Sequence, residues 1–218
     1  MLTVYGVHNS RASRVIWLCY ELGVPFEQKK VVQAYRLATR PPGVPVINTR
    51  SPEFIRVNPA GLIPAIDDDG LVLTESMAIT LYLARKHGGP VAPASVAEEG
   101  QAMQWTFWAA TEIERHALDV LFNRALKPEE ERDSVAADNA EGILRDKLPV
   151  LDAALEKTGW LVGDRFTVAD LNVAEVIRYA SPAPRLFALN PNIKRWLDAC
   201  RERPAFRRMW EERAAELA

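Results

Sequence analysis

The stretch that decides the fold is Asn58–Ser76, which reads NPAGLIPAIDDDGLVLTES. In its middle, the acidic turn Asp67–Gly70 separates two short apolar runs, a pattern typical of a β-hairpin. Pro64 is expected to open the first hairpin strand, because the first residue of a strand need not donate to the ladder. A residue before proline is extended, so we expect Ile63 to present its backbone to a group outside the sheet.

A helix start follows the hairpin. Thr74–Ser76 precedes the apolar run Met77–Ala84, so a helix N-terminus with a hydroxyl and a carboxylate arrives beside the hairpin. Taken alone, the proline turn and the helix start each have a plain structural interpretation. Pro64 can simply form a turn, since only about 5–6% of X–Pro bonds in folded proteins are cis, and Ser76 or Thr74 can simply cap the helix. Their order and spacing together predict a pocket for a small zwitterion.

This stretch resembles the glutathione-binding half of the glutathione transferases. In that family a cis-proline follows the residue whose backbone pairs with the cysteinyl part of glutathione, and a Glu/Gln/Asp-Ser pair holds the γ-glutamyl part. The resemblance implies that the Ile63–Pro64 bond is cis. It also implies that Ile63, Pro64, Glu75 and Ser76 bind glutathione.

Length and charge limit the class of partner. The chain has 218 residues and a formal net charge of −2 with both signs scattered, so no basic stripe or polybasic helix indicates nucleic acid or a membrane surface. Cys19 and Cys200 form neither a CxxC pair nor a metal-ligand cluster. No segment approaches about eighteen uncharged apolar residues. We therefore expect a cytoplasmic protein without a metal, whose partner is a small molecule or another protein.

The order of elements predicts a thioredoxin-like domain followed by helices. A strand at Leu2–Tyr5, a helix that stops at Gly23 and a strand at about Phe26–Val32 form a βαβ unit. The central stretch then completes the order βαβαββα. The predicted domains are residues 1–87, a linker at 88–94 and an all-helical domain at 95–218.

The helical domain carries two capping signals. Ser95–Glu98 is a capping box for a long helix that reaches about Arg124, and Thr167–Asp170 predicts a second helix cap. The resemblance implies that this second cap belongs to the buried central helix of the domain. We expect this second cap to serve folding rather than chemistry. Pro149 is expected to kink or divide the helix around it.

The loop before the first helix carries the candidate chemistry. Residues 8–14 read HNSRASR and contain no cysteine, so dithiol exchange by the protein alone is not expected. Resemblance to cytosolic bacterial transferases of the serine type, similar to the theta and delta classes, implies that Ser10 donates to the sulfur of glutathione, with Asn9 as the alternative. Lowering a thiol pKa of about 8.5 by two units takes about 2.7 kcal/mol. One hydrogen bond to a charged group supplies about 1.5–3 kcal/mol.

One position departs from the family pattern. Leu62, just before Ile63, cannot pair with the glycyl carboxylate of glutathione through its side chain. The long connection at residues 33–57 is expected to border the pocket, since such connections are often functional. We expect Arg36 to meet the carboxylate, with Arg40 and Arg50 as alternatives. Two other interpretations stay open: glutathione is held weakly, or the ligand is not glutathione.

A second group of residues lies on the predicted long helix. Trp105, Trp108 and Glu112 recur at helical spacing, and such a stripe is core more often than pocket. The resemblance implies that they form one wall of the second-substrate site.

The resemblance as a whole implies a homodimeric glutathione transferase. Glutathione is its co-substrate, and the activated thiol attacks a small hydrophobic electrophile. Two alternatives stay open: a glutathione-dependent disulfide or peroxide reductase in which Asn9 and Ser10 hold the thiolate, and a non-catalytic interaction protein with the same fold. The pair Glu75-Ser76 favours an enzyme, because an interaction module need not retain it.

Overall fold

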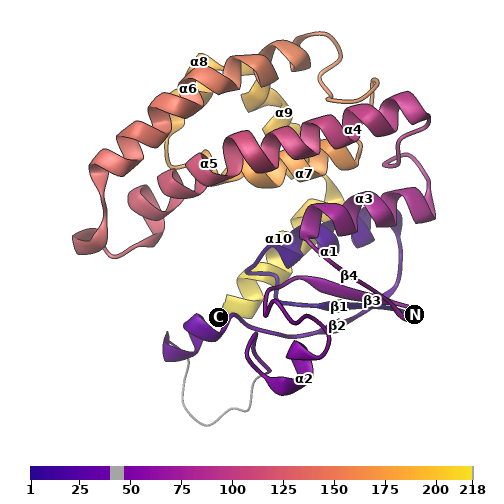
Figure 1. Ribbon diagram of the computed structural model, residues 1–218. Helices are drawn as coiled ribbons and strands as arrows, with labels where there is room; N and C mark the ends of the chain where they lie inside the picture. The colour runs from indigo at the N-terminus through magenta and orange to yellow at the C-terminus, as the bar shows by residue number, and fades with distance from the viewer. Residues whose placement is uncertain (40–46, 218) are drawn as a thin grey trace. The chain divides into compact units, whose positions relative to one another are not determined.

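The computed structural model describes residues 1–39 and 47–217, and the chain divides into two units (Figure 1). The sheet unit contains residues 1–87 and the C-terminal helix α10 (Pro204–Leu217), whereas the helical unit contains residues 88–203. The prediction from sequence assigned α10 to the helical domain. The structure instead packs it on α1 (Ala12–Leu22), where Phe206 meets the buried Trp17 edge to face at 5.0 Å.

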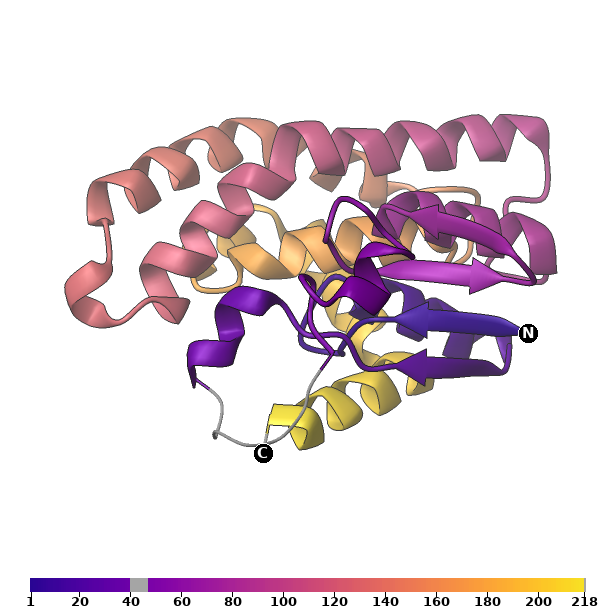
Figure 2. The ribbon, with the colours of Figure 1, turned by 60° about the horizontal axis from the view of Figure 1, so that its bottom comes forward.

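The sheet unit has the predicted order βαβαββα of a thioredoxin-like domain. Its four strands run in the order β2-β1-β3-β4, with β1 parallel to β2 and antiparallel to β3, and β3 antiparallel to β4. Figures 1 and 2 show α1 and α3 on one face of the sheet and α2 on the other. The element bounds are β1 Leu2–Tyr5, β2 Phe26–Lys29, η1 Ala34–Thr39, α2 Pro52–Ile55, β3 Ala65–Asp68, β4 Leu71–Thr74 and α3 Ser76–His87.

The predicted hairpin is present, and its turn explains the acidic sequence. Asp69 and Gly70 have φ of 54° and 93°, and two positive φ values in a two-residue loop match the twist of the flanking strands. The second strand is shorter than predicted. It ends at Lys29, and Val32 instead forms an isolated bridge with Asn48.

Apolar side chains fill both faces of the sheet. The helix α1 is buried along its first eight residues. On the other face, Val31, Phe54 and Ala65 form a small cluster against which Ile63 packs. The residue before Pro64 is therefore anchored by its side chain, while its backbone lies at the end of β3.

The helical unit begins with one long helical run. The predicted helix at residues 95–124 is present, but π-helical segments interrupt it after Trp108 and after Leu121. Pro149 lies within α6 and does not divide it. The bounds are α4 Val96–Trp108, η2 Ala109–Ile113, α5 Glu114–Leu121, η3 Phe122–Leu126, η4 Glu129–Glu131, α6 Ser134–Glu156, α7 Val168–Ile177, η5 Arg178–Ala180, α8 Pro184–Leu189 and α9 Pro191–Glu202.

The cap of α7 forms as predicted. The Thr167 hydroxyl and N–H both bond to Asp170, at 3.0 and 2.8 Å, and the N–H of Leu161 and the indole N–H of Trp196 donate to the other carboxylate oxygen. Every residue of α7 is buried, so this cap sits in the centre of the unit.

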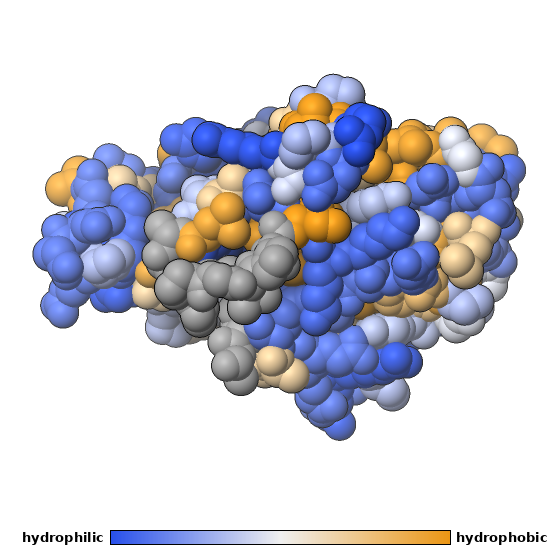
Figure 3. Space-filling model, turned by 90° about the horizontal axis from the view of Figure 1, so that it is seen from below, coloured by the Kyte–Doolittle hydropathy of each residue, from blue (hydrophilic) through white to orange (hydrophobic). Residues whose placement is uncertain are grey.

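The described surface mixes polar and apolar residues. On the face drawn in Figure 3, hydrophobic residues gather in separate patches among hydrophilic ones. Among residues 1–39 and 47–217, no helix has the length and apolar character needed to cross a membrane.

Candidate active site

The turn before β3 has the predicted geometry, and the Ile63–Pro64 bond is cis. The buried Asn58 side chain braces the turn, donating to the carbonyl of Leu62 at 2.7 Å and accepting from the N–H of Ala60 at 3.1 Å. Within the described part of the chain, no hydrogen bond reaches the backbone of Ile63. An extended ligand can pair with such a backbone as an added strand does.

The start of α3 offers a second set of polar groups. Glu75 is exposed with φ of 64°, a left-handed conformation that is uncommon for a residue other than glycine and is concentrated at functional sites. The buried Ser76 hydroxyl accepts a hydrogen bond from Nη1 of Arg14 at 3.0 Å, which leaves its own hydrogen to donate. Because the first N–H groups of a helix lack intrahelical acceptors, this end of α3 suits a carboxylate.

Ser10 lies in the loop that leads into α1. Its hydroxyl donates to the carbonyl of Val7 at 2.7 Å and accepts from the N–H of Ala12 at 3.0 Å. Gly6 brings this loop close to the Ile63 turn. A Cβ atom at Gly6 would lie 2.8 Å from that of Ala12 and 3.6 Å from that of Ile63, so only glycine permits this approach.

The arginines proposed for the ligand carboxylate have different surroundings. Arg36 donates from Nη1 to the carbonyl of Asn9 at 2.7 Å, so it lies at the Ser10 loop. Arg50 is exposed, and its N–H bonds to the side chain of Asn48. Arg40 lies outside the described residues.

Comparisons with known proteins agree with this geometry. Residues 10–86 match the family described as the glutathione S-transferase N-terminal domain, and residues 113–204 match its C-terminal domain. Glutathione S-transferase GstB of Escherichia coli K12 is 32% identical over 213 residues, which cover 96% of this chain and 97% of that protein. The chain belongs to the glutathione S-transferase family.

The chain is also similar to two further proteins. The theta class glutathione S-transferase of Xanthomonas axonopodis pv. citri, solved with glutathione bound, is 26% identical with a TM-score of 0.78, over 95% of both chains. Human elongation factor 1-gamma is 33% identical over 162 residues, which cover 72% of this chain but 36% of that protein. Membership of the glutathione S-transferase family confirms the predicted fold and supports glutathione conjugation as the activity.

The helical unit contains the residues predicted for the second substrate. Trp105 and Trp108 are partly buried and pack edge to face with centroids 5.4 Å apart. The π-helical segment that follows changes the register, so the uninterrupted stripe assumed from sequence does not extend past Trp108. Glu112 is exposed and pairs with Lys147 of α6.

Two features of this glutathione S-transferase site were not anticipated. Arg14, only 1% exposed, donates a hydrogen bond to Ser76, and the signal in the sequence is a charged residue just before the apolar run Val15–Cys19. The second is a set of contacts from α10 to His8 and Asn9, described below. Their partners are about 200 residues apart in the chain, so no local pattern indicates them.

Proposed function

We propose that this chain is a serine-type glutathione transferase similar to the theta and delta classes. The backbone of Ile63 and the side chains of Glu75 and Ser76 hold glutathione, Pro64 fixes the turn, and the Ser10 hydroxyl stabilises the thiolate that attacks a small hydrophobic electrophile. The supporting observation is that one unit combines the cis turn, the left-handed Glu75 and the Ser10 loop.

The Ser10 hydroxyl reaches the sulfur by rotation about its Cβ–Oγ bond. In the present arrangement its hydrogen points to the carbonyl of Val7, while the N–H of Ala12 occupies one lone pair. Turning the hydrogen towards a sulfur exchanges a neutral acceptor for a charged one, and bonds to charged groups contribute about 1.5–3 kcal/mol. The nearby start of α1 adds the favourable end of the helix dipole. Asn9 is the alternative donor.

The remaining contacts complete the proposal. Arg36 meets the glycyl carboxylate, since it comes from the connection at residues 33–57 and its guanidinium lies at the Ser10 loop. Trp105 and Trp108 form one wall of the electrophile site, and their paired rings supply a large apolar surface. With Lys147 already bound, Glu112 contributes at most the edge of that wall.

Both cysteines are poor candidates for redox chemistry. Burial raises the pKa of the Cys19 thiol to about 12, and Cys200 is buried as well. A reductase reaction would therefore take both thiols from glutathione. The relative named elongation factor 1-gamma supports a second candidate, a non-catalytic interaction module with the same fold.

We also propose that the protein is a cytoplasmic homodimer. On α4, Met103 and Phe107 lie one turn apart and are 44% and 61% exposed. Exposed apolar side chains grouped on one helix face are typical of a protein interface.

The decisive experiment compares wild type with Ser10→Ala and Asn9→Ala. Glutathione affinity is measured by calorimetry, and a pH–rate profile is recorded with a generic aromatic electrophile. We expect Ser10→Ala to bind glutathione within about threefold of wild type while the pKa of the bound thiol rises by roughly one to two units, since one bond to a charged sulfur is lost.

Other outcomes change the assignment. Coincident profiles for wild type and Ser10→Ala, together with a shifted profile for Asn9→Ala, transfer the role to Asn9. Absence of glutathione binding by wild type favours the interaction module.

A further inference from the structure

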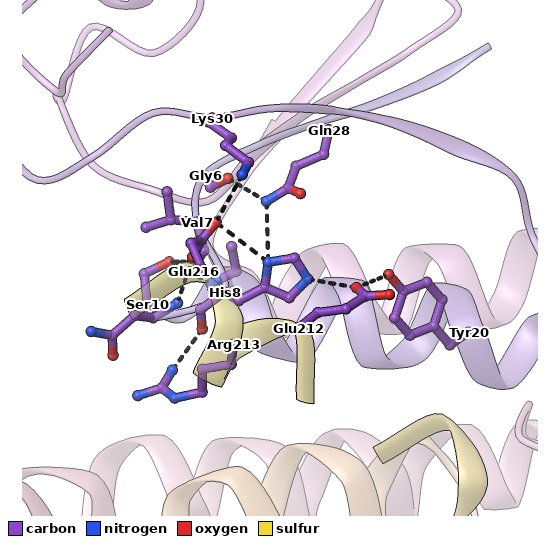
Figure 4. A network of polar contacts seen from close by, with 12 residues as sticks. Gly6, Val7, His8, Ser10, Tyr20, Gln28, Lys30, Glu212, Arg213 and Glu216 are labelled. Carbon is purple, nitrogen blue, oxygen red and sulfur yellow. Dashed lines mark hydrogen bonds and ion pairs between the residues drawn. The ribbon is translucent and has the colours of Figure 1, made fainter. Parts of the chain in front are cut away.

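One turn of α10 bonds to the two residues that precede Ser10. Figure 4 shows His8 beside Glu212, Arg213 and Glu216 of this helix. Nε2 of His8 lies 3.0 Å from a carboxylate oxygen of Glu212, and its Nδ1 lies 3.5 Å from Glu216. The other Glu216 oxygen accepts from the N–H of Asn9 at 3.3 Å, and Arg213 donates to the carbonyl of His8 at 2.6 Å. We call Glu212, Arg213 and Glu216 the α10 clamp.

The clamp supplies hydrogen-bond partners to two backbone groups, the His8 carbonyl and the Asn9 N–H. His8 is 6% exposed, and its carbonyl and the next N–H have their partners on α10 rather than on a neighbouring strand. Buried backbone groups need partners, so these bonds determine where the loop lies. His8 and Asn9 lie between Val7 and Ser10 in the chain, and the Ser10 hydroxyl bonds to the carbonyl of Val7. The position of this hydroxyl therefore depends on where the clamp holds the loop.

The contacts of the clamp favour the ionised form of its two carboxylates. Burial alone would raise the pKa of Glu216, but bonds from His8 and the Asn9 N–H outweigh it and the pKa lies below its usual value. Burial also opposes ionisation of Glu212, and bonds from Tyr20, Arg208 and His8 lower its pKa. Lys30 approaches Glu216 to 4.0 Å.

We propose that His8 is a positioning residue for thiol activation, and that the α10 clamp acts on the reaction through it by fixing the Ser10 loop. This rests on the function proposed above. An imidazolium donates from both nitrogens, so protonated His8 bridges Glu212 and Glu216 at once. In neutral His8, one nitrogen has no hydrogen, and Gln28, whose Nε2 lies 3.5 Å from Nδ1, competes with Glu216 there.

The test removes one clamp carboxylate and keeps the rest of the site. In Glu216→Ala the contacts of Ile63, Glu75 and Ser76 are unchanged, so we expect glutathione affinity within about threefold of wild type. The pKa of the bound thiol, read from its ultraviolet absorbance, should rise by about one unit, which lowers the fraction of thiolate at neutral pH. Glu216→Gln retains an oxygen for the Asn9 N–H and should restore part of the shift. Glu211→Ala, an exposed glutamate on the same helix, is the matched control and should leave the thiol unchanged.

A double-mutant cycle separates positioning from general loss of structure. If the clamp acts through the Ser10 hydroxyl, adding Glu216→Ala to Ser10→Ala shifts the thiol pKa no further, because the group that it positions is already gone. An equal shift in both backgrounds overturns the proposal. His8→Ala should behave as Glu216→Ala does, and a wild-type thiol pKa in that variant also overturns it.

Amide hydrogen exchange distinguishes failure of the clamp from failure of the proposed function. The Asn9 amide, released from Glu216, should exchange at least about tenfold faster in Glu216→Ala than in wild type, as opened local structure does. If wild type does not lower the pKa of the bound thiol, the proposed function fails while this exchange result still reports on the clamp. Unchanged exchange at Asn9 refutes the clamp whatever the chemistry.

Discussion

Glu75 adopts the least common backbone conformation in the candidate site, with φ of 64°. A left-handed conformation costs a residue with a side chain roughly 1–2 kcal/mol, whereas glycine adopts it freely but loses about 0.5–1 kcal/mol of chain entropy on folding. We predict that Glu75→Gly changes the free energy of unfolding by at most about 1 kcal/mol. Glutathione binding should nevertheless weaken at least about tenfold, as expected when a ligand loses a charged partner. Denaturant titration and calorimetry measure the two quantities.

Asp69 supplies the matched control. It has φ of 54° in the hairpin turn, and its pairing with the chain N-terminus is exposed and contributes little. Asp69→Gly should alter stability to a similar extent and leave glutathione affinity unchanged. Unaltered affinity in Glu75→Gly would mean that the left-handed residue serves the start of α3 only.

Site residues could be predicted from sequence where the signal is local. The cis turn at Ile63 and the Glu75-Ser76 pair lie within the one stretch Asn58–Ser76, so their order carries the information. Arg14 and Ser76 are 62 residues apart, and His8 and Glu212 are 204 apart. Nothing in the neighbourhood of either partner specifies the other, and only the fold brings them together.

At the scale of elements, the cap of α7 is the clearest structural feature. Asp170 is fully buried and accepts from the backbone of Leu161 and Thr167 and the indole of Trp196. Asp170→Ala leaves these donors buried without an acceptor, at about 1–3 kcal/mol each. We predict a loss of at least about 3 kcal/mol in the free energy of unfolding. Asp198→Ala, which breaks a surface ion pair with Lys194, is the control and should cost less than about 1 kcal/mol.

The same residue predicts a pH dependence. Burial raises the pKa of Asp170 to about 6, against bonds from Trp196, Thr167 and Leu161 that lower it. The folded state therefore holds this proton more tightly than the unfolded state. The resulting stabilisation is complete below the ordinary pKa and is lost as pH rises through about 6. The stability difference between wild type and Asp170→Ala should be larger at about pH 5 than at about pH 7.5. A difference independent of pH would place the folded pKa near its usual value.

The sequence predicted whether a segment is helix or strand more accurately than it predicted where each segment ends. Gly23 and the Asp69-Gly70 turn stop their elements where predicted, because positive φ favours these residues. No Gly or Pro marks the π-helical segment after Trp108. Strand β2 ends at Lys29, before the apolar pair Val31 and Val32 that the predicted strand included. These ends depend on tertiary contacts that a local pattern does not contain.

For the whole molecule, the exposed face of α4 predicts an oligomer. A glutamate at Phe107 would have to be desolvated in an apolar interface, so Phe107→Glu should shift the proposed dimer towards monomer. Sedimentation velocity measures the change. Val135→Glu is the control, since Val135 is also an exposed apolar residue but lies on α6, and it should leave the dimer intact. A monomeric wild type would contradict the prediction.

The placement of α10 is the main feature of the architecture that sequence did not predict. Its apolar positions indicate which face is buried, but not which surface buries that face. We predicted that α10 belongs to the helical domain because it directly follows the other helices in the chain. The structure packs it on α1 because Trp17 presents a fully buried ring to Phe206.

The packing of α10 on α1 predicts that weakening this contact destabilises the sheet unit rather than the helical unit. Phe206→Ala removes an aromatic contact with Trp17 at 5.0 Å, and such truncations in cores cost about 3–5 kcal/mol. Amides of α1 and α10 should then exchange hydrogen faster in native conditions, while those of α7, in the other unit, keep most of their protection. Asp170→Ala should give the reverse pattern, so the two variants control for each other. If Phe206→Ala lowers protection in α7 and spares α1, α10 is energetically part of the helical unit; equal losses in both would show that the two units unfold as one.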